Sequence, residues 1–350
     1  MNENCTTNRR EGASTGELRI GSHRLRNTAF LAPMSGVSDA PFRRLAWRFG
    51  AGMVVSEMVA SEAFTTGQEE MRLKAESAGL PLHIVQLAGK EPQWMREATL
   101  IAEAAGADVI DINMGCPSKR VTNGYSGSAL MRDLDHALTL IDAVVETTEK
   151  PVTLKMRLGW DENSINAPQL ARRAVEAGVQ MITVHGRTRN QFYKGQANWD
   201  AVRAVREEIS VPLIVNGDID SAATARQALA ASGADGVMVG RASYGAPWLP
   251  GQLGEALAGH VVPQRPSGKD FADLVCEHYE AMLSHYGLEL GIRNARKHLD
   301  WYCAHLPVSQ DYSDTRRAMM TSRDVSEILR VAFDLFALVE PENALTAKAA

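Results

Sequence analysis

Short runs of Val, Ile and other apolar residues recur along the chain, and an amphipathic stretch long enough for a helix follows each of them. Runs that stay apolar throughout are typical of parallel strands covered on both faces. The pattern therefore predicts alternating strands and helices around a parallel sheet. The expected strands lie at residues 28–32, 52–56, 82–87, 109–113, 152–155, 181–185, 213–216 and 236–240.

Residues that are polar or glycine lie at the carboxyl ends of successive runs. They are Ser56, Gln86, Asn113, Lys155, His185, Asn216 and Gly240. In a closed barrel these ends converge on one mouth, where active sites of this fold lie, whereas in an open sheet they would be spread along an edge. Eight strand–helix units also suit the ~250 residues typical of a (β/α)8 TIM barrel. We therefore predict an α/β fold of that type at residues 18–258.

The alternation of strands and helices stops after Trp248, and the remaining chain has helical patterning. Four prolines, Pro247, Pro250, Pro263 and Pro266, indicate a linker. Helices are expected at residues 270–285, 292–305 and 324–338, where apolar residues recur at helical spacing. A helical domain is thus predicted at residues 259–340, with disordered tails at residues 1–17 and 341–350.

The composition is that of a soluble globular protein, with 45% hydrophobic and 23% charged residues. No apolar run reaches the ~18 to 20 residues of a membrane span, and the polar N-terminus lacks the apolar core of a signal peptide, so a cytoplasmic location is expected. Cys5, Cys116, Cys276 and Cys303 are scattered and form no Cys-x-x-Cys pair, which argues against a disulfide scaffold or a zinc ribbon. No metal site, membrane contact or protein partner is predicted.

The formal net charge of −5 offers no general attraction for a polyanion, so nucleic-acid binding would need a local basic surface. Residues 291–323 contain six basic residues (Arg293, Arg296, Lys297, Arg316, Arg317 and Arg323) and three acidic ones (Asp300, Asp311 and Asp314). The spacing of Arg293, Arg296 and Lys297 at i, i+3 and i+4 places them on one helix face, where they could bind a phosphate backbone.

The most informative stretch runs over residues 111–131. It ends an apolar strand at Asn113 and continues with Gly115, Cys116 and Pro117, then a loop containing Gly124 and Gly127. A cysteine at the end of a strand, beside a loop with this much freedom, is suited to chemistry on an exposed ligand. The alternative is a buried, inert cysteine, because free cysteine packs as a small hydrophobe.

Two cationic or ionisable residues, Lys155 and His185, end otherwise apolar strands. An unpaired cation there would cost several kcal/mol, so an anionic or hydrogen-bonding group should meet each side chain. A bound cofactor would satisfy both. The alternatives are an ion pair of Lys155 with Asp111 and a satisfied core histidine at position 185.

The sequence Asp-Ile-Asn-Met-Gly-Cys-Pro at residues 111–117, followed by Gly-Ser-Ala-Leu-Met at 127–131, resembles the signature of the tRNA-dihydrouridine synthases. These are flavin enzymes that reduce uridine in tRNA, and the bacterial B type is nearest. Further similar motifs lie in the same order at residues 32–34, 85–89, 154–157, 185–188, 216–219, 240–242 and 296–298. The resemblance extends over roughly residues 18–338.

The resemblance implies FMN as cofactor, NADPH as reductant and tRNA as substrate. It places the flavin ring against Pro33, Met34, Ser35 and Gln86, and the ring and ribityl region against Lys155 and His185. At the ends of the last two strands, Asn216, Gly217, Asp218, Gly240 and Arg241 would hold the FMN phosphate, at a common phosphate site of this barrel. No Gly-x-Gly-x-x-Gly follows a strand and no P-loop is present, so a mononucleotide flavin fits better than a dinucleotide fold.

Reduction of the C5–C6 bond of uracil needs a hydride at C6 and a proton at C5. Cys116 is the expected acid, since a thiol with a pKa of ~8.5 is mostly protonated at neutral pH. Asn113 is expected to contact the base edge, Arg187 or Arg189 a phosphate or sugar, and Arg293, Arg296 and Lys297 the tRNA backbone. A base reached in a barrel mouth must leave its stack, which is easiest in a strained loop such as the tRNA D-loop.

Other functions share some of these features. A flavin barrel that acts on a free pyrimidine or dihydroorotate would use the same hydride chemistry without a basic helical domain. A tRNA-binding regulator without catalysis would not need Cys116, Lys155 and His185 together. A Schiff-base barrel with Lys155 as its amine is the weakest of these alternatives.

Overall fold

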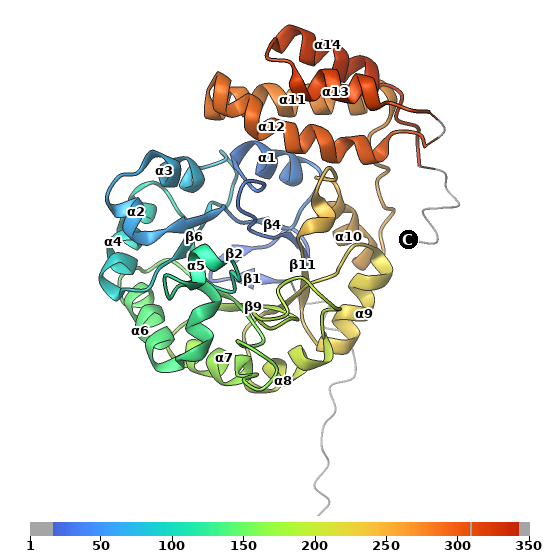
Figure 1. The fold of residues 1–350 in the computed structure, drawn as a ribbon. Helices are drawn as coiled ribbons and strands as arrows, with labels where there is room; N and C mark the ends of the chain where they lie inside the picture. The colour runs from blue at the N-terminus through green and yellow to red at the C-terminus, as the bar shows by residue number, and fades with distance from the viewer. Residues whose placement is uncertain (1–16, 309, 343–350) are drawn as a thin grey trace, which may run out of the picture.

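A parallel sheet closed into a barrel forms the body of the molecule (Figure 1). The computed structural model describes residues 17–308 and 310–342. The nine strands of this sheet follow the order β4-β3-β11-β10-β9-β8-β7-β6-β5. Strands that are neighbours in this order pair in parallel. The two edge strands, β4 (Met53–Val54) and β5 (Met58–Ala60), are consecutive in the chain, so one short bend joins the two edges.

The bend between β4 and β5 keeps the hydrogen bonding of the barrel continuous. Gly52 donates its N–H to Ala29 on one side, and Ser56 donates its N–H to Ile84 on the other. Within the predicted strand at residues 52–56, only β4 is a regular strand. Ser56 already bonds to the neighbour on the other side, and β5 lies beyond the predicted range. The predicted (β/α)8 barrel is confirmed.

The other seven predicted strands are all present, with ends that differ from the prediction by at most two residues. They are β3 (Ala29–Leu31), β6 (Ile84–Ala88), β7 (Val109–Met114), β8 (Val152–Arg157), β9 (Met181–His185), β10 (Leu213–Asn216) and β11 (Gly236–Val239).

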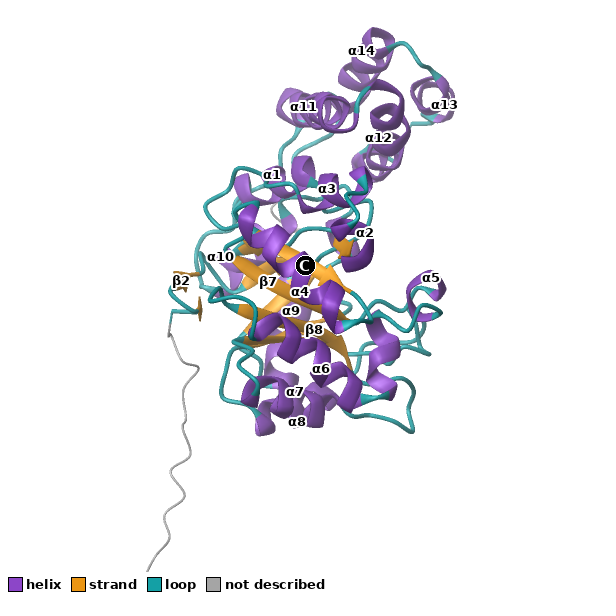
Figure 2. Cartoon of the chain, turned by 90° about the vertical axis from the view of Figure 1, so that its left-hand side faces the viewer, coloured by secondary structure: helices purple, strands orange, loops and turns teal. Residues whose placement is uncertain are grey.

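Helices surround the barrel and shield its outer face (Figures 1 and 2). They are α1 (Ala40–Arg48), α2 (Ser61–Thr65), α3 (Glu69–Ala75), α4 (Pro92–Ala104), α5 (Lys119–Thr122), α6 (Leu134–Val145), α7 (Ala167–Glu176), α8 (Asp200–Glu208), α9 (Ala222–Ser232) and α10 (Leu249–Leu257). Short 3-10 helices η1 (Gly127–Arg132) and η2 (Arg241–Ser243) follow β7 and β11. The predicted linker was wrong at Pro250. This proline lies in the first turn of α10, a position where proline is favoured, and does not mark a linker.

The interior of the barrel is apolar at one end and polar at the other. Phe30, Met53, Ile84 and Val109 pack together near the amino ends of the strands. The small hairpin of β1 (Arg19–Ile20) and β2 (His23–Arg24) adds Ile20 to this cluster. Because side chains alternate along a strand, inward positions nearer the carboxyl ends carry the polar residues that the sequence placed there.

Beyond the barrel lie α11 (Gly268–Tyr286), α12 (Leu288–Tyr302), η3 (Cys303–His305), α13 (Ser313–Thr321) and α14 (Val325–Phe336). They share a core that includes Phe271, Tyr302 and Phe336, and they form a separate group beside α1 in Figure 1. Helix α13 was not predicted, because Met319 is its one buried residue and it has no apolar stripe.

The predicted C-terminal helical region is confirmed. The division at residue 259 falls between α10 and α11, and this boundary remains a prediction, as does a tRNA-binding role for the region. Residues 1–16 and 343–350, which make up most of the predicted tails, lie outside the described residues. None of the helices described here combines the length and the apolar character required to cross a membrane.

Candidate active site

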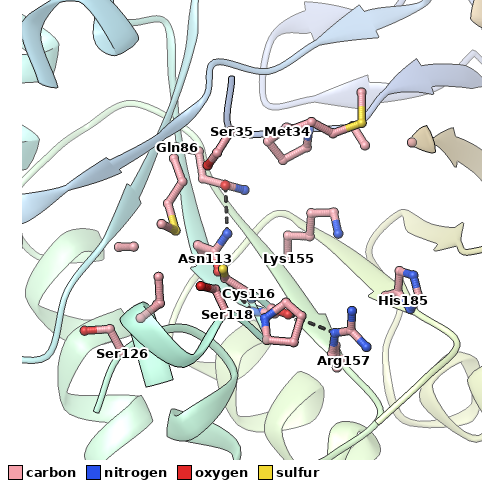
Figure 3. Close-up of a pocket in the computed structure, with 18 of the residues that line it drawn as sticks. Met34, Ser35, Gln86, Asn113, Cys116, Ser118, Ser126, Lys155, Arg157 and His185 are labelled. Carbon is pink, nitrogen blue, oxygen red and sulfur yellow. Dashed lines mark hydrogen bonds between the residues drawn. The ribbon is translucent and has the colours of Figure 1, made fainter. Parts of the chain in front are cut away.

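A cavity of about 1160 Å³ opens at the carboxyl ends of the barrel strands. Its walls include six of the seven residues predicted at strand ends: Gln86, Asn113, Lys155, His185, Asn216 and Gly240. Figure 3 shows several of these side chains around the cavity. Ser56 does not line it, because its hydroxyl donates to the Glu57 carbonyl and accepts from the Gln86 N–H.

Cys116 lies at the cavity wall, directly after β7. The carbonyl of Cys116 accepts from the Ser128 hydroxyl at 2.8 Å, and its N–H donates to Asn113 Oδ1 at 3.0 Å. Gly127 has φ of +61°, and a Cβ there would lie 2.9 Å from the Cys116 oxygen, so glycine is required for this turn. Burial raises the pKa of the Cys116 thiol above its ordinary value, which keeps the thiol protonated at neutral pH.

Asn113 and Gln86 form a hydrogen-bonded pair at the floor of the cavity (Figure 3). Asn113 Nδ2 donates to Gln86 Oε1 at 2.8 Å. Below them lies the carboxylate of Asp111, which accepts from Gln86 at 2.6 Å and from Thr153 at 2.6 Å. Burial raises the pKa of Asp111 to about 6. Sequence reasoning treated Asp111 only as a possible partner of Lys155.

Lys155 projects from β8 and donates to Asn216 Oδ1 at 3.1 Å. The ion pair with Asp111 that the sequence left open is not formed, because Asp111 accepts from Gln86 and Thr153 instead. Burial, followed by the charge of Arg157, lowers the pKa of Lys155 to about 8. The Lys155 ammonium faces the cavity, has a single neutral partner and retains N–H groups that can donate to a ligand.

His185 ends β9 at the same mouth. Its Nδ1 atom is buried and has no hydrogen-bond partner among the described residues. Burial, followed by the charges of Arg157 and Lys155, lowers the pKa of the imidazole well below its usual range, so the ring is neutral at pH 7. It is therefore not a satisfied core histidine, and it has a free ring nitrogen to offer.

The turns after β10 and β11 lie on the opposite side of the mouth from Gln86. Gly217 has φ of +115°, and a Cβ there would come within 2.9 Å of the Ala197 side chain. A Cβ at Gly240, in contrast, would meet nothing closer than Met34 Sδ at 3.8 Å. Protein packing therefore leaves space beside Gly240, on the cavity side.

Arg187 departs from its predicted contact with substrate. The side chain is 2% exposed, and its guanidinium donates to both carboxylate oxygens of Asp218 and to the carbonyls of Lys194 and Gly195. Burial alone would raise the pKa of Asp218, but hydrogen bonds from Arg187 and Ala197 hold it below its ordinary value. These contacts leave Arg187 little capacity to bind RNA, and its role in this structure is to order the turn at Asp218.

Arg241, on the same turn as Gly240, keeps an accessible guanidinium. Its side chain is 50% exposed, lies over the Tyr193 ring at 4.7 Å and approaches Asp218 at 3.4 Å. Arg189 lies over Trp160 and donates to the hydroxyl of Thr122, so its guanidinium is partly engaged as well.

The predicted basic face of α12 is also different in the structure. Arg293 is exposed, but Arg296 donates to the Ser322 carbonyl at 3.1 Å. Lys297 points toward the barrel, since a Cβ on Gly36 would lie 3.0 Å from its Nζ atom. Trp301 on the same helix stacks on Tyr244 of the cavity wall at 4.1 Å. This face packs against the barrel, so Arg293 alone of the three projects freely into solvent.

Sequence reasoning missed Arg157, which the structure places in the cavity wall. Its Nε donates to the Gly115 carbonyl at 2.9 Å, beside Cys116, and Nη1 donates to the carbonyls of Thr188 and Phe192. The available signal was its position two residues after Lys155, which puts both side chains on the inner face of β8.

The loop after β3 brings Pro33, Met34 and Ser35 to the cavity wall. The N–H of Met34 donates to the Ser38 hydroxyl at 2.8 Å, and the N–H of Gly36 donates to the buried carboxylate of Glu57. The three residues predicted to contact a flavin ring are therefore held together on one side of the same cavity as Gln86, Lys155 and His185.

A model of the family described as "Dihydrouridine synthase (Dus)" matches residues 30–337. The chain belongs to the dihydrouridine synthase family. This membership makes it part of an oxidoreductase family and confirms the resemblance drawn from the motifs.

Relatives in this family are similar over most of their length. One from Rhizobium leguminosarum bv. phaseoli, named "Probable tRNA-dihydrouridine synthase", is 57% identical over 305 residues, covering 87% of this chain and 93% of the relative. Another from Xanthomonas axonopodis pv. citri, named "tRNA-dihydrouridine synthase B", is 44% identical over 297 residues, covering 84% of this chain and 89% of the relative. The second match agrees with the resemblance to the bacterial B type.

Two solved structures share the fold at low sequence identity. TcOYE with pHBA gives a TM-score of 0.54 at 14% identity, covering 70% of this chain and 92% of that chain. Histamine dehydrogenase from Rhizobium sp. 4-9 gives a TM-score of 0.50 at 14% identity, covering 75% of this chain and 50% of that chain. These similarities concern the fold of the family and not its substrate.

Proposed function

We propose that this member of the dihydrouridine synthase family reduces the C5–C6 double bond of a uridine in the D-loop of tRNA, with FMN as cofactor and NADPH as reductant. The observation that carries the proposal is a protonated thiol, Cys116, on the wall of a cavity that is large enough for a mononucleotide and a base and is lined by polar residues from six strand ends and loops. The names of the relatives supply tRNA as the substrate.

The residues of the cavity fit a flavin mononucleotide. His185 Nδ1 is buried without a partner among the described residues, Lys155 has one neutral partner, and a Cβ at Gly240 would meet no protein atom closer than 3.8 Å. Lys155 and His185 would bind the ring and ribityl region, Pro33, Met34, Ser35 and Gln86 the ring, and Asn216, Gly217, Asp218, Gly240 and Arg241 the phosphate region. Among these, Arg241 and the loop amides would contact the phosphate, because the Asp218 carboxylate is held by Arg187.

The bound flavin would supply the hydride that C6 of uracil requires. Cys116 would deliver the proton to C5 from its thiol, which burial keeps protonated. Asn113 would hold the base edge, since it lines the cavity and retains one amide N–H after donating to Gln86. Arg157 would keep the Cys116 turn in place through the Gly115 carbonyl.

The exposed Arg241 at the cavity would be available for phosphates of the RNA, and so would Arg293, which is exposed on α12. A cytoplasmic location is part of the proposal, since the substrate is tRNA. The test is direct: purified protein, NADPH and tRNA lacking dihydrouridine are combined, and dihydrouridine is measured by mass spectrometry. A yellow flavin band without dihydrouridine formation would favour a barrel acting on a free pyrimidine, and no flavin band would favour a non-catalytic role.

We also expect ping-pong kinetics, because one cavity would receive NADPH and the uridine in turn. The sequence contains neither a dinucleotide-binding Gly-x-Gly-x-x-Gly after a strand nor a P-loop that could hold the reductant elsewhere. Initial rates measured over a grid of NADPH and tRNA concentrations should give parallel double-reciprocal lines. Intersecting lines, or a productive ternary complex in a single turnover, would show that the two sites are distinct.

A further inference from the structure

A chain of hydrogen bonds leads from a buried carboxylate to the backbone of Cys116. Asp111 accepts from Gln86 Nε2 at 2.6 Å, and Gln86 Oε1 accepts from Asn113 Nδ2 at 2.8 Å. Asn113 Oδ1 accepts from the N–H groups of Gly115 at 3.1 Å and Cys116 at 3.0 Å. Asp111 is 4% exposed and does not line the cavity, so it acts only through its neighbours.

The direction of every bond in this relay follows from its Cys116 end. A backbone N–H can only donate, so Asn113 must turn its oxygen toward Gly115 and Cys116. Its amide nitrogen then faces Gln86, which must present its own oxygen to Asn113 and its nitrogen to position 111. The relay therefore requires an acceptor at position 111, and an ionised carboxylate is a group that can only accept.

Burying a carboxylate at position 111 has an unfavourable free energy of desolvation. Its remaining oxygen accepts from the Thr153 hydroxyl at 2.6 Å, and within the described ranges its hydrogen-bond partners are neutral side chains. Burying a charge without an ion pair is unfavourable unless hydrogen bonds compensate it. Hydrogen bonds to an ionised acceptor are roughly twice as strong as neutral ones, so the carboxylate holds the Gln86 amide more firmly than a neutral group would.

We propose that Asp111 is a positioning residue that fixes the orientation of the Gln86 and Asn113 amides and, through them, the position of the Cys116 thiol. The inference rests on the proposed function, since it assigns a purpose to the placement of Cys116. It also has a consequence for the cavity floor. With the bonds directed this way, Gln86 and Asn113 each keep one free N–H, so the floor offers donors to ligand carbonyl oxygens.

The experiment measures the thiol rather than turnover. Variants are made in a background in which Cys5, Cys276 and Cys303 are alanine, and the rate of Cys116 alkylation by iodoacetamide is followed against pH in the protein as purified. Asp111→Leu removes the acceptor, whereas Asp111→Asn keeps one. A neutral hydrogen bond corresponds to a factor of roughly 2 to 12 in an equilibrium. Asp111→Leu should therefore alkylate about five- to tenfold faster. Asp111→Asn should lie between it and the wild type, because its neutral acceptor holds Gln86 less firmly than the carboxylate does.

A matched pair of threonine variants separates the relay from general loosening. Thr153→Val removes the hydroxyl that supports Asp111, while Thr99→Val removes a buried hydroxyl that donates to the Met95 carbonyl within α4. Thr153→Val should change the alkylation profile and Thr99→Val should not. An unchanged Cys116 profile in folded Asp111→Leu, or equal changes in both threonine variants, would overturn the proposal.

If Asp111→Leu does not fold, a swap keeps the question answerable. Gln86→Glu alone puts two carboxylates against each other and should disturb the alkylation profile of Cys116. In the double variant Gln86→Glu, Asp111→Asn, the new glutamate accepts from Asn113 and also accepts from the amide of the new asparagine. Recovery of the profile in the double variant supports the relay, and its failure refutes it. The alkylation experiment uses neither tRNA nor NADPH. A negative result therefore does not contradict the proposed uridine reduction, and a protein that fails to form dihydrouridine can still show the relay.

Discussion

Replacement of Cys116 by alanine is expected to abolish uracil reduction while the steps that do not use the thiol continue. The thiol lies on the cavity wall, and burial keeps it protonated, so its proposed role is to supply one positioned proton. Loss of such a donor typically slows the chemical step by about 10² to 10⁴-fold. Dihydrouridine formation should fall by that order, while flavin content, tRNA binding and oxidation of NADPH stay near wild type.

The other cysteines provide the control. Cys276 and Cys303 lie in α11 and η3, where each donates weakly to a backbone carbonyl, and Cys5 lies outside the described residues. Alanine at these positions should leave the kinetics nearly unchanged. If the Cys116 variant modified tRNA at the wild-type rate, with chemistry shown to be rate-limiting, Cys116 would be structural and another group would have to supply the proton.

The double variant Lys155→Ala, Arg241→Ala should lose its flavin. The two cations reach the cavity from the ends of β8 and β11. Lys155 has a neutral partner, and Arg241 makes one exposed contact with Asp218, at 3.4 Å. A hydrogen bond to a charged group contributes about 1.5–3 kcal/mol. Removing both should weaken FMN by about 3–6 kcal/mol, or roughly 10² to 10⁴-fold in Kd, measured by fluorescence titration of FMN into flavin-free protein.

A matched double variant tests whether the loss is specific. Lys90→Ala, Arg120→Ala removes the same amount of charge from the same cavity, but from the side of β6 and α5. It should retain FMN, because neither residue is among the proposed contacts of the phosphate or the ring. Full flavin occupancy in the Lys155, Arg241 double variant, or equal loss in the control, would remove this assignment of the cofactor site.

Much of the barrel could be predicted because its signals are local. A continuous apolar run defines a buried parallel strand, and β9 and β10 begin and end at the residues that the pattern indicated. The mouth could be predicted for the same reason: parallel strands end at one rim, and six of the seven residues predicted at strand ends line the cavity. Helix α13, with one buried residue, has no such local signal.

These local patterns could not predict the partners of individual side chains. Arg187 was expected at the substrate, but the fold brings Asp218, which is 31 residues later, against its guanidinium. Lys297 was expected on a free face of α12, but that face packs on the barrel beside Gly36. A cation next to solvent and a cation next to a carboxylate look the same in the sequence.

The sequence by itself determined the fold class, the mouth of the barrel and the family, because strand periodicity, strand-end residues and the order of motifs are properties of neighbouring residues. Tertiary structure alone decided which polar groups are satisfied and which are left to bind a ligand. Asp111 illustrates the difference, since its partners Gln86 and Thr153 lie 25 residues before it and 42 residues after it. Hydrogen-bond satisfaction depends on groups within about 3 Å in space, and closure of the barrel is what brings them to that distance.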